Sequence, residues 1–165
     1  MEADQLTRFN ELPASAAREA LLACCSSGSW AERMAGGRPY SSPQDAIRQS
    51  SVIVASLTMA DLAEALAGHP RIGERPDTDQ SQREQALVST ADAQTARELA
   101  ASNLEYEARF GHIYLVCASG KTAKQLLALL RSRLRNDTRA EWRVVRSELQ
   151  KINAIRLRQL LACSR

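Results

Sequence analysis

Residues 138–162 read TRAEWRVVRSELQKINAIRLRQLLA and carry the longest helical pattern of the chain. At about 100° per residue, the apolar side chains of this stretch fall on one stripe of a helix. The stripe consists of Trp142, Val145, Leu149, Ile152 and Leu160. Lys151 and Arg158 project from the opposite side, where their charges meet solvent. The pattern predicts a long amphipathic helix that buries one face.

Arg156 interrupts this apolar stripe, four residues after Ile152 and four before Leu160. A guanidinium directed at a core needs an anionic partner, because an unpaired buried charge is very costly. One interpretation is a structural ion pair, or an arginine that extends its charged head to solvent near the helix end. The other is a planar fork positioned to bind a substrate carboxylate or phosphate.

The composition is that of a helical protein. The chain has 165 residues, of which 44% are hydrophobic and 25% charged. Alanine occurs 27 times and leucine 20 times, against only 7 glycines and 5 prolines, which argues against an all-β sandwich or barrel. We expect an all-α, single-domain bundle of about eight to ten helices over residues 1–165, with a core within about residues 6–162.

Capping signals and glycines place the shorter helices. Thr58 with Asp61, and Ser81 with Glu84, have the spacing of capping boxes. Gly68 fits the left-handed position that often follows a helix. The expected helices are 14–26, one from Pro43, 61–67, one from Ser81 that breaks near 89–92 and ends before Gly111, 121–135 and 138–162. Residues 27–43 are expected to be rich in turns, and residues 113–118 to be a link between helices.

The sequence also indicates where the chain works. No run of about 18 apolar residues occurs, so no membrane partner is expected. The opening MEADQLTRFNELP shows no secretory signal, which favours the cytoplasm. Cys24, Cys25, Cys117 and Cys163 form no C-x-x-C pair, and there are only two histidines. We therefore expect reduced, mostly buried thiols and no metal.

The net charge of +3 is distributed unevenly along the chain. Residues 121–165 carry 12 Lys and Arg against 3 Asp and Glu, whereas the first 120 residues carry 10 against 16. A basic C-terminal third is compatible with a nucleic-acid face. It is equally compatible with docking on the acidic part of the same chain, or with an anionic small molecule. Charge alone does not choose between them.

Two further positions are candidates for chemistry. His69 follows Gly68 at an expected helix end, and Pro70 restricts its backbone conformation. It is either a capping residue or an acid–base group. Ser81 and Glu84 are explained by the capping box alone. The same helix N-terminus, with Gln85 on its first turn, would also offer backbone N–H groups to an anion.

Seven short motifs resemble one family when they are taken in order. They are Phe9-Asn-Glu-Leu-Pro13, Trp30…Met34…Arg38-Pro39-Tyr40, His69-Pro-Arg-Ile-Gly73, Ser81-Gln-Arg-Glu-Gln85, Asn103…Tyr106-Glu-Ala-Arg-Phe-Gly111, Tyr114-Leu-Val-Cys-Ala118 and Lys151-Ile…Arg156-Leu157. The chain resembles the bacterial form of the 2-oxo-4-hydroxy-4-carboxy-5-ureidoimidazoline (OHCU) decarboxylases. The resemblance covers about residues 6–162.

This resemblance implies a cofactor-free, all-α decarboxylase, usually a homodimer, that completes the oxidation of urate to (S)-allantoin. It implies no metal, no nucleic acid and no membrane partner. The family's essential residues fall on His69, Glu84 and Arg156. Its substrate contacts fall on Pro70, Ser81, Gln82, Arg83, Gln85, Val116, Cys117, Ala118, Ser119 and Gly120.

The implied chemistry suits these residue types. Arg156 would orient the anionic substrate, while Glu84 and His69 would hydrogen-bond its hydroxyl group and one of them would accept the proton. Two other classes remain open. A nucleic-acid-binding helical module would use the basic C-terminal third and bind in a salt-dependent way. A helical scaffold would perform no small-molecule chemistry.

Overall fold

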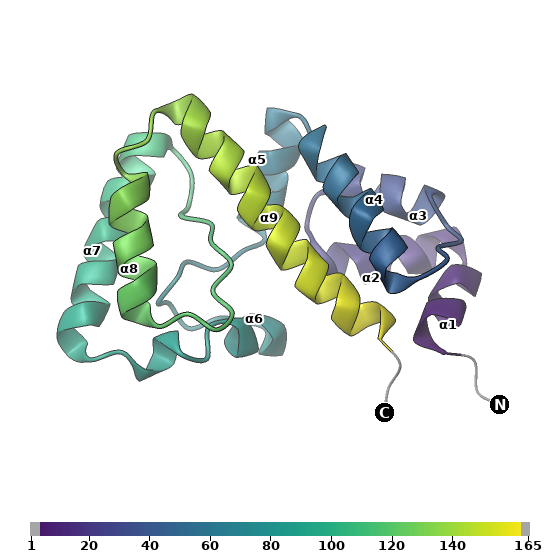
Figure 1. The fold of residues 1–165 in the computed structure, drawn as a ribbon, viewed down its shortest axis with the longest axis horizontal. Helices are drawn as coiled ribbons and strands as arrows, with labels where there is room; N and C mark the ends of the chain where they lie inside the picture. Colours follow the sequence, from purple (N-terminus) through teal and green to yellow (C-terminus); the bar gives the residue numbers. More distant parts are fainter. Residues whose placement is uncertain (1–3, 163–165) are drawn as a thin grey trace. The chain divides into compact units, whose positions relative to one another are not determined.

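The computed structural model describes residues 4–162, and over them the chain forms nine α-helices and one short 3-10 helix, with no strand (Figure 1). The helices are α1 (Gln5–Glu11), α2 (Ala14–Cys24), α3 (Gly28–Gly36), α4 (Pro43–Ala55), α5 (Met59–Ala67), α6 (Asp79–Glu84), η1 (Val88–Thr90), α7 (Ala93–Phe110), α8 (Ala123–Arg133) and α9 (Thr138–Leu161). The expected all-α fold of eight to ten helices is confirmed.

The contacts between residues divide the chain into two compact units. The first unit holds α1 to α5 and the part of α9 that begins at Leu149. The second unit runs from His69 to Glu148. Helix α9 therefore contributes its first half to one unit and its second half to the other. A single domain over residues 1–165 stays a prediction.

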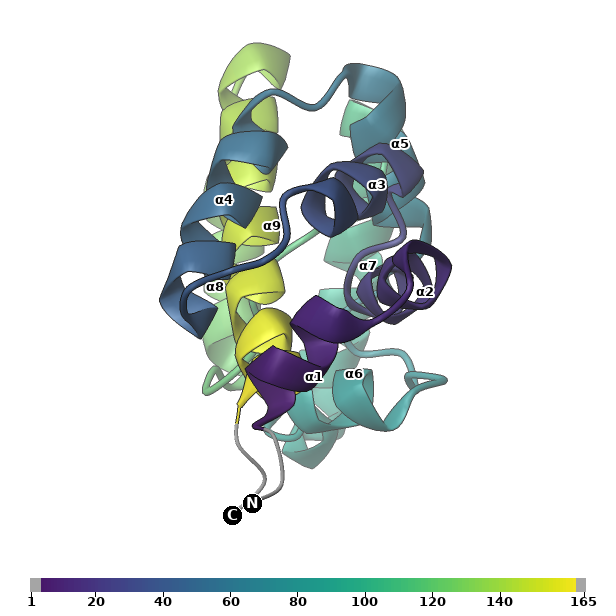
Figure 2. The same ribbon diagram turned by 90° about the vertical axis from the view of Figure 1, so that its right-hand side faces the viewer.

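In the first unit, α2 and α3 pack side by side (Figure 2). The expectation that residues 27–43 are mostly turns is wrong for α3. The Ser27 hydroxyl caps this helix by accepting from the Trp30 N–H at 3.2 Å. Trp30 and Met34 lie one turn apart and are fully buried. The glycines that suggested turns stand at the two ends of α3, where they do not interrupt it.

Two of the motifs of the first unit hold each other. Arg38 donates from Nη1 to the carbonyl oxygens of Phe9 at 2.8 Å and Leu12 at 2.7 Å. The Asn10 carboxamide exchanges two bonds of 2.9 Å with the backbone of Tyr40. These motifs therefore join the end of α1 to the segment after α3, and their role here is structural.

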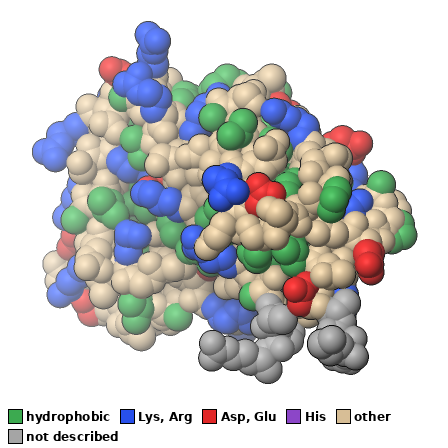
Figure 3. Space-filling model, turned by 45° about the vertical axis from the view of Figure 1, so that its right-hand side comes forward, with side chains coloured by type: hydrophobic (Ala, Val, Ile, Leu, Met, Phe, Trp, Pro, Cys, Tyr) green, Lys and Arg blue, Asp and Glu red, His purple; other side chains and the backbone are tan. Residues whose placement is uncertain are grey.

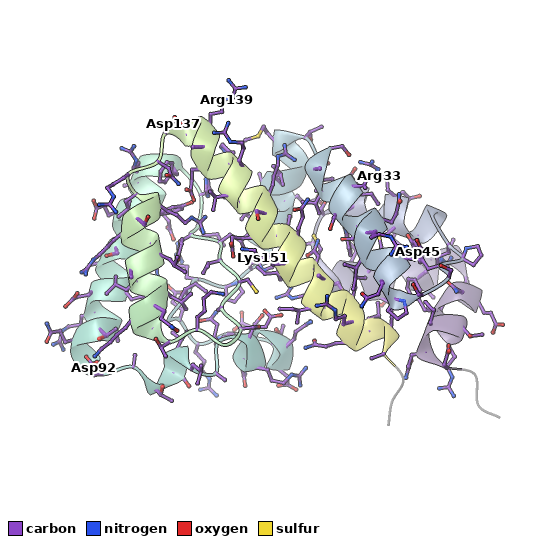
Figure 4. All side chains as sticks on the ribbon, viewed as in Figure 1. Arg33, Asp45, Asp92, Asp137, Arg139 and Lys151 are labelled. Atoms are coloured by element: carbon purple, nitrogen blue, oxygen red, sulfur yellow. The ribbon has the colours of Figure 1, made fainter. Side chains whose placement is uncertain are left out.

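In the second unit, α7 and α8 lie side by side around a core that includes Leu99, Tyr106 and Leu126 (Figure 1). Asp92 stands at the start of α7 and accepts from the Thr95 N–H at 2.8 Å (Figure 4). The break near 89–92 and the helix end before Gly111 are confirmed. The segment between Gly111 and α8 forms no strand, so the expected link at 113–118 is confirmed.

The predicted capping box of Ser81 and Glu84 is wrong. Thr78 is the N-cap of α6, and its hydroxyl oxygen accepts from the Ser81 N–H at 3.2 Å. Because the helix begins three residues earlier than predicted, Glu84 is its last residue and Gln85 its C-cap. Residues 81–85 therefore do not present a helix N-terminus to an anion.

The second correction concerns Gly68, which was expected in the left-handed conformation. It follows α5 with φ −86°, a conformation open to any residue. The reason for a glycine at this position is close packing instead, since a Cβ atom there would stand 1.8 Å from the Ser26 hydroxyl oxygen. The capping box of Thr58 and Asp61 at the start of α5 is confirmed.

No single helix among residues 4–162 is long and apolar enough to cross a membrane. Only α4 and α5 taken together reach the required length and composition, and they are bent by 119° with respect to each other. Both bury core side chains, such as Ile53 and Leu62. Cys24, Cys25 and Cys117 are free and buried, as expected, and Cys163 lies outside the described residues.

Candidate active site

A small cavity in the second unit brings together residues that lie far apart in the sequence. Its lining includes six of the expected site residues: His69, Pro70, Glu84, Gln85, Val116 and Ala118. The apolar side chains of Ile72, Tyr114 and Leu115 complete it. Its volume of about 20 Å³ admits one water-sized molecule, so these residues form a lining without enclosing a larger ligand by themselves.

His69 and Glu84 are the two titratable side chains of this lining. Both are half-buried. His69 opens the second unit directly after Gly68, and Glu84 stands at the last position of α6. The capping explanation for Glu84 is thus removed, and the residue lies on the lining of the cavity. An imidazole and a carboxylate in one partly desolvated site are suited to moving a proton.

Gln85 fixes the loop that follows His69. Its side-chain oxygen accepts from the Gly73 N–H at 3.0 Å, and its side-chain nitrogen donates to the Arg71 carbonyl at 3.4 Å. The Asn103 carboxamide donates to the Ile72 carbonyl at 2.8 Å. The amide of Gln85, expected as a substrate contact, is therefore bonded to the backbone of the loop that carries part of the cavity lining.

The other expected substrate contacts lie outside this lining. Ser81 is buried, while Gln82 and Arg83 are exposed. Gln82 faces a wider, open depression of about 480 Å³ whose lining also includes Gln85. Cys117, Ser119 and Gly120 lie next to Val116 and Ala118 in the sequence, but none of these three residues is part of the lining. Substrate contact by any of these residues stays a prediction.

The electrostatic environment of Cys117 is set by its burial and by nearby charged side chains. Burial raises the pKa of the Cys117 thiol above its ordinary value. The Lys121 ammonium opposes this shift, whereas the carboxylates of Glu148 and Glu84 add to it. The thiol is therefore neutral and suited to packing, and Glu84 and Glu148 both act on the same short stretch of chain.

Arg156 belongs to the first unit, and its predicted burial is confirmed, with 6% of its surface exposed. Its Nη1 donates to the carbonyl oxygen of Cys24, the last residue of α2, at 2.9 Å. A cation at a helix C-terminus is favourable, because the carbonyls there carry partial negative charge. Arg156 therefore has a structural contact, and its membership of one site with His69 and Glu84 stays a prediction.

Sequence reasoning missed the buried carboxylates Glu141 and Glu148. Glu141 forms an ion pair with Arg133 and accepts from the Tyr106 hydroxyl, and all three residues are buried. Arg133 also donates to the Leu115 carbonyl at 2.6 Å. A signal was present, since the two glutamates lie seven residues apart and so occupy one side of a helix. Their partners, however, lie in other segments.

Among residues 4–162, no three His, Cys, Asp or Glu side chains are grouped so that they would hold a metal ion. The absence of a metal and of a cofactor stays a prediction.

The chain has an all-α fold with a histidine and a glutamate on one small cavity, and comparison with known proteins defines its class. The family model of OHCU decarboxylase matches residues 10–158. The chain therefore belongs to the OHCU decarboxylase family. The matched range extends over both structural units.

Individual relatives agree with this assignment. The uric acid degradation bifunctional protein TTL of Arabidopsis thaliana is 31% identical over 147 residues, which are 84% of this chain and 45% of that protein. This chain thus spans less than half of that relative's length. The 2-oxo-4-hydroxy-4-carboxy-5-ureidoimidazoline decarboxylase of Amia calva is 25% identical over 134 residues, 77% of each chain. A crystal structure of OHCU decarboxylase in the presence of (S)-allantoin matches with a TM-score of 0.78 and 31% identity, over 88% of this chain and 98% of that one.

Proposed function

We propose that this chain decarboxylates 2-oxo-4-hydroxy-4-carboxy-5-ureidoimidazoline to (S)-allantoin, without a cofactor, as the last step of urate oxidation. The observation that carries the proposal is the match to the OHCU decarboxylase crystallised in the presence of (S)-allantoin, which extends over 98% of that chain. The placement of His69 and Glu84 on one cavity supports it from the side of the chemistry.

The substrate carries a carboxylate and a hydroxyl group on one ring carbon, next to a C=N bond. When CO2 leaves, the electron pair of the broken C–C bond forms a double bond between the two ring carbons, and the C=N nitrogen takes up the displaced electrons together with one proton from solvent. We assign Arg156 to binding the anionic substrate, through the charge and planar fork of its guanidinium.

Glu84 and His69 are the groups that we assign to the proton transfers. The hydroxyl group becomes a carbonyl when it loses its proton, and one of the two side chains would accept it. Protonation of the neighbouring ring carbon from one face then gives the S product. Both side chains are half-buried, so a bound substrate would complete their separation from water.

The proposal includes the homodimer that the family resemblance implies, the cytoplasmic location, and a small-molecule substrate in place of a nucleic acid. Within the second unit, two arginines of the C-terminal third form ion pairs, Arg131 with Glu98 at 2.6 Å and Arg133 with Glu141. On the face shown in Figure 3, Lys and Arg side chains are scattered among apolar and neutral atoms. Both observations support the small-molecule assignment.

The test follows the circular dichroism of allantoin formed from substrate that is generated in place from urate by the two preceding enzymes. We expect the wild-type chain to accelerate a one-handed signal, and His69→Asn to abolish the acceleration while remaining folded. A slow racemic trace from folded wild-type protein, identical to the trace without it, would remove the decarboxylase assignment. Near-full turnover by His69→Asn would remove His69 from the mechanism and leave the activity standing.

A further inference from the structure

The segment of residues 114–118 forms part of the cavity lining without regular secondary structure. Tyr114, Leu115, Val116 and Ala118 share the lining with His69 and Glu84, whereas Cys117 does not. All five residues of the segment are buried. Because no helix or strand pairs with this backbone among the described residues, its buried N–H and C=O groups need other partners.

The Ala118 carbonyl accepts from the Lys121 backbone N–H at 3.0 Å, and charged side chains supply three further partners. The Cys117 N–H donates to Oε2 of Glu148 at 2.7 Å, and Nζ of Lys121 donates to the Cys117 carbonyl at 2.8 Å. Arg133 donates from Nη1 to the Leu115 carbonyl at 2.6 Å. Hydrogen bonds with one charged partner are shorter and stronger than neutral ones. The backbone of the segment is therefore fixed at residues 115 and 117 by side chains that lie outside the segment.

Glu148 provides the contact to Cys117 from α9, where its side chain is buried and does not line the cavity. A buried carboxylate is costly unless hydrogen bonds satisfy it, and the Cys117 N–H supplies one such bond to Glu148. We propose that Glu148 is a positioning residue, whose carboxylate fixes the Cys117 N–H and thereby holds Val116 and Ala118 in the lining shared with His69 and Glu84. The proposal rests on the proposed function only in taking this cavity as catalytic.

Three variants distinguish the loss of the hydrogen bond to Cys117 from the loss of the Glu148 charge and from a general loss of stability. Glu148→Ala removes the acceptor of the Cys117 N–H. Glu148→Gln keeps an oxygen acceptor and removes the charge. Val145→Ala removes buried apolar volume one turn earlier in α9 and leaves the hydrogen bond in place. If Glu148→Ala fails to fold, Glu148→Asp replaces it, since aspartate withdraws the carboxylate by one methylene group.

The first measurement is the rate at which iodoacetamide alkylates Cys117, quantified by mass spectrometry of its own peptide. The Glu148 charge raises the pKa of this thiol, so Glu148→Gln is the reference for the loss of charge. We expect alkylation about tenfold faster in Glu148→Ala than in Glu148→Gln, because the Cys117 N–H loses its partner and the segment opens more often. Val145→Ala is expected to stay close to the wild type.

The second measurement is kcat and KM for allantoin formation. We expect kcat/KM to fall about tenfold or more in Glu148→Ala and to be restored in Glu148→Gln. Equal alkylation rates in folded Glu148→Ala and Glu148→Gln, or wild-type kcat/KM in Glu148→Ala, would overturn the proposal. A wild-type chain that forms no allantoin, but in which Glu148→Ala still speeds alkylation, would contradict the proposed function and support the positioning of the segment.

Discussion

The guanidinium of Arg156 has a structural contact, and its chemical role is a prediction of the proposed function. One of its N–H groups donates to the Cys24 carbonyl at 2.9 Å. That bond fixes the side chain against the C-terminal end of α2. If Arg156 binds the anionic substrate as proposed, this contact lowers the side-chain entropy lost on binding.

Replacing Arg156 by lysine tests the chemical role at the residue scale. Lysine keeps the charge and loses the planar fork, so we expect kcat/KM to fall between about tenfold and a hundredfold. Urea unfolding of the same variant measures how much of the effect is structural. Arg158→Lys, on the exposed side of the same helix, is the matched control and should retain full activity. Unchanged kcat/KM in Arg156→Lys would contradict the chemical role and leave Arg156 with its structural contact alone.

At the scale of the element, α6 matters because a helix of six residues positions Glu84. Short helices are marginal by themselves, so the cap has a large share in holding this one. The cap is the Thr78 hydroxyl, whereas the sequence pattern pointed to Ser81. The hydroxyl group of Ser81, inside the helix, has no part in the cap.

We expect Thr78→Ala to weaken α6 by about 1 kcal/mol, and Ser81→Ala to leave the cap intact. Hydrogen exchange over residues 78–85, followed by mass spectrometry, should be about fivefold faster in Thr78→Ala than in the wild type. The Ser81→Ala variant should show wild-type exchange there. Faster exchange in Ser81→Ala alone would restore the capping box that the sequence suggested.

Local patterns predicted the elements whose signals are local. The stripe that ends at Leu160 predicted α9 and the burial of Arg156, since helical period and burial are both properties of one segment. The pattern failed for α3, where glycines at the helix ends resembled turns, and for α6, where two residues had capping spacing. Glu148 was missed because its partner Cys117 lies 31 residues away, and only the folded chain brings them together.

At the scale of the whole molecule, α9 is the element that belongs to both units. Before Glu148 it buries Val145 in the second unit, and after it Leu149 and Leu157 in the first. The first unit is also discontinuous, because residues 69–148 lie between its two parts of the chain. Its core therefore lacks the last turns of α9 until the second unit has been synthesised.

We expect the two units to unfold in one transition. Melting one half of a continuous helix leaves unsatisfied backbone groups at the new end of the other half, which destabilises it. The chain has two tryptophans, Trp30 in the first unit and Trp142 in the second. In Trp142→Phe, fluorescence reports on the first unit alone, and in Trp30→Phe on the second alone. In each variant, urea unfolding followed by fluorescence should coincide with unfolding followed by helical circular dichroism. A fluorescence midpoint that departs from the helical one in either variant would show that the units unfold separately, and that the continuity of α9 does not couple them.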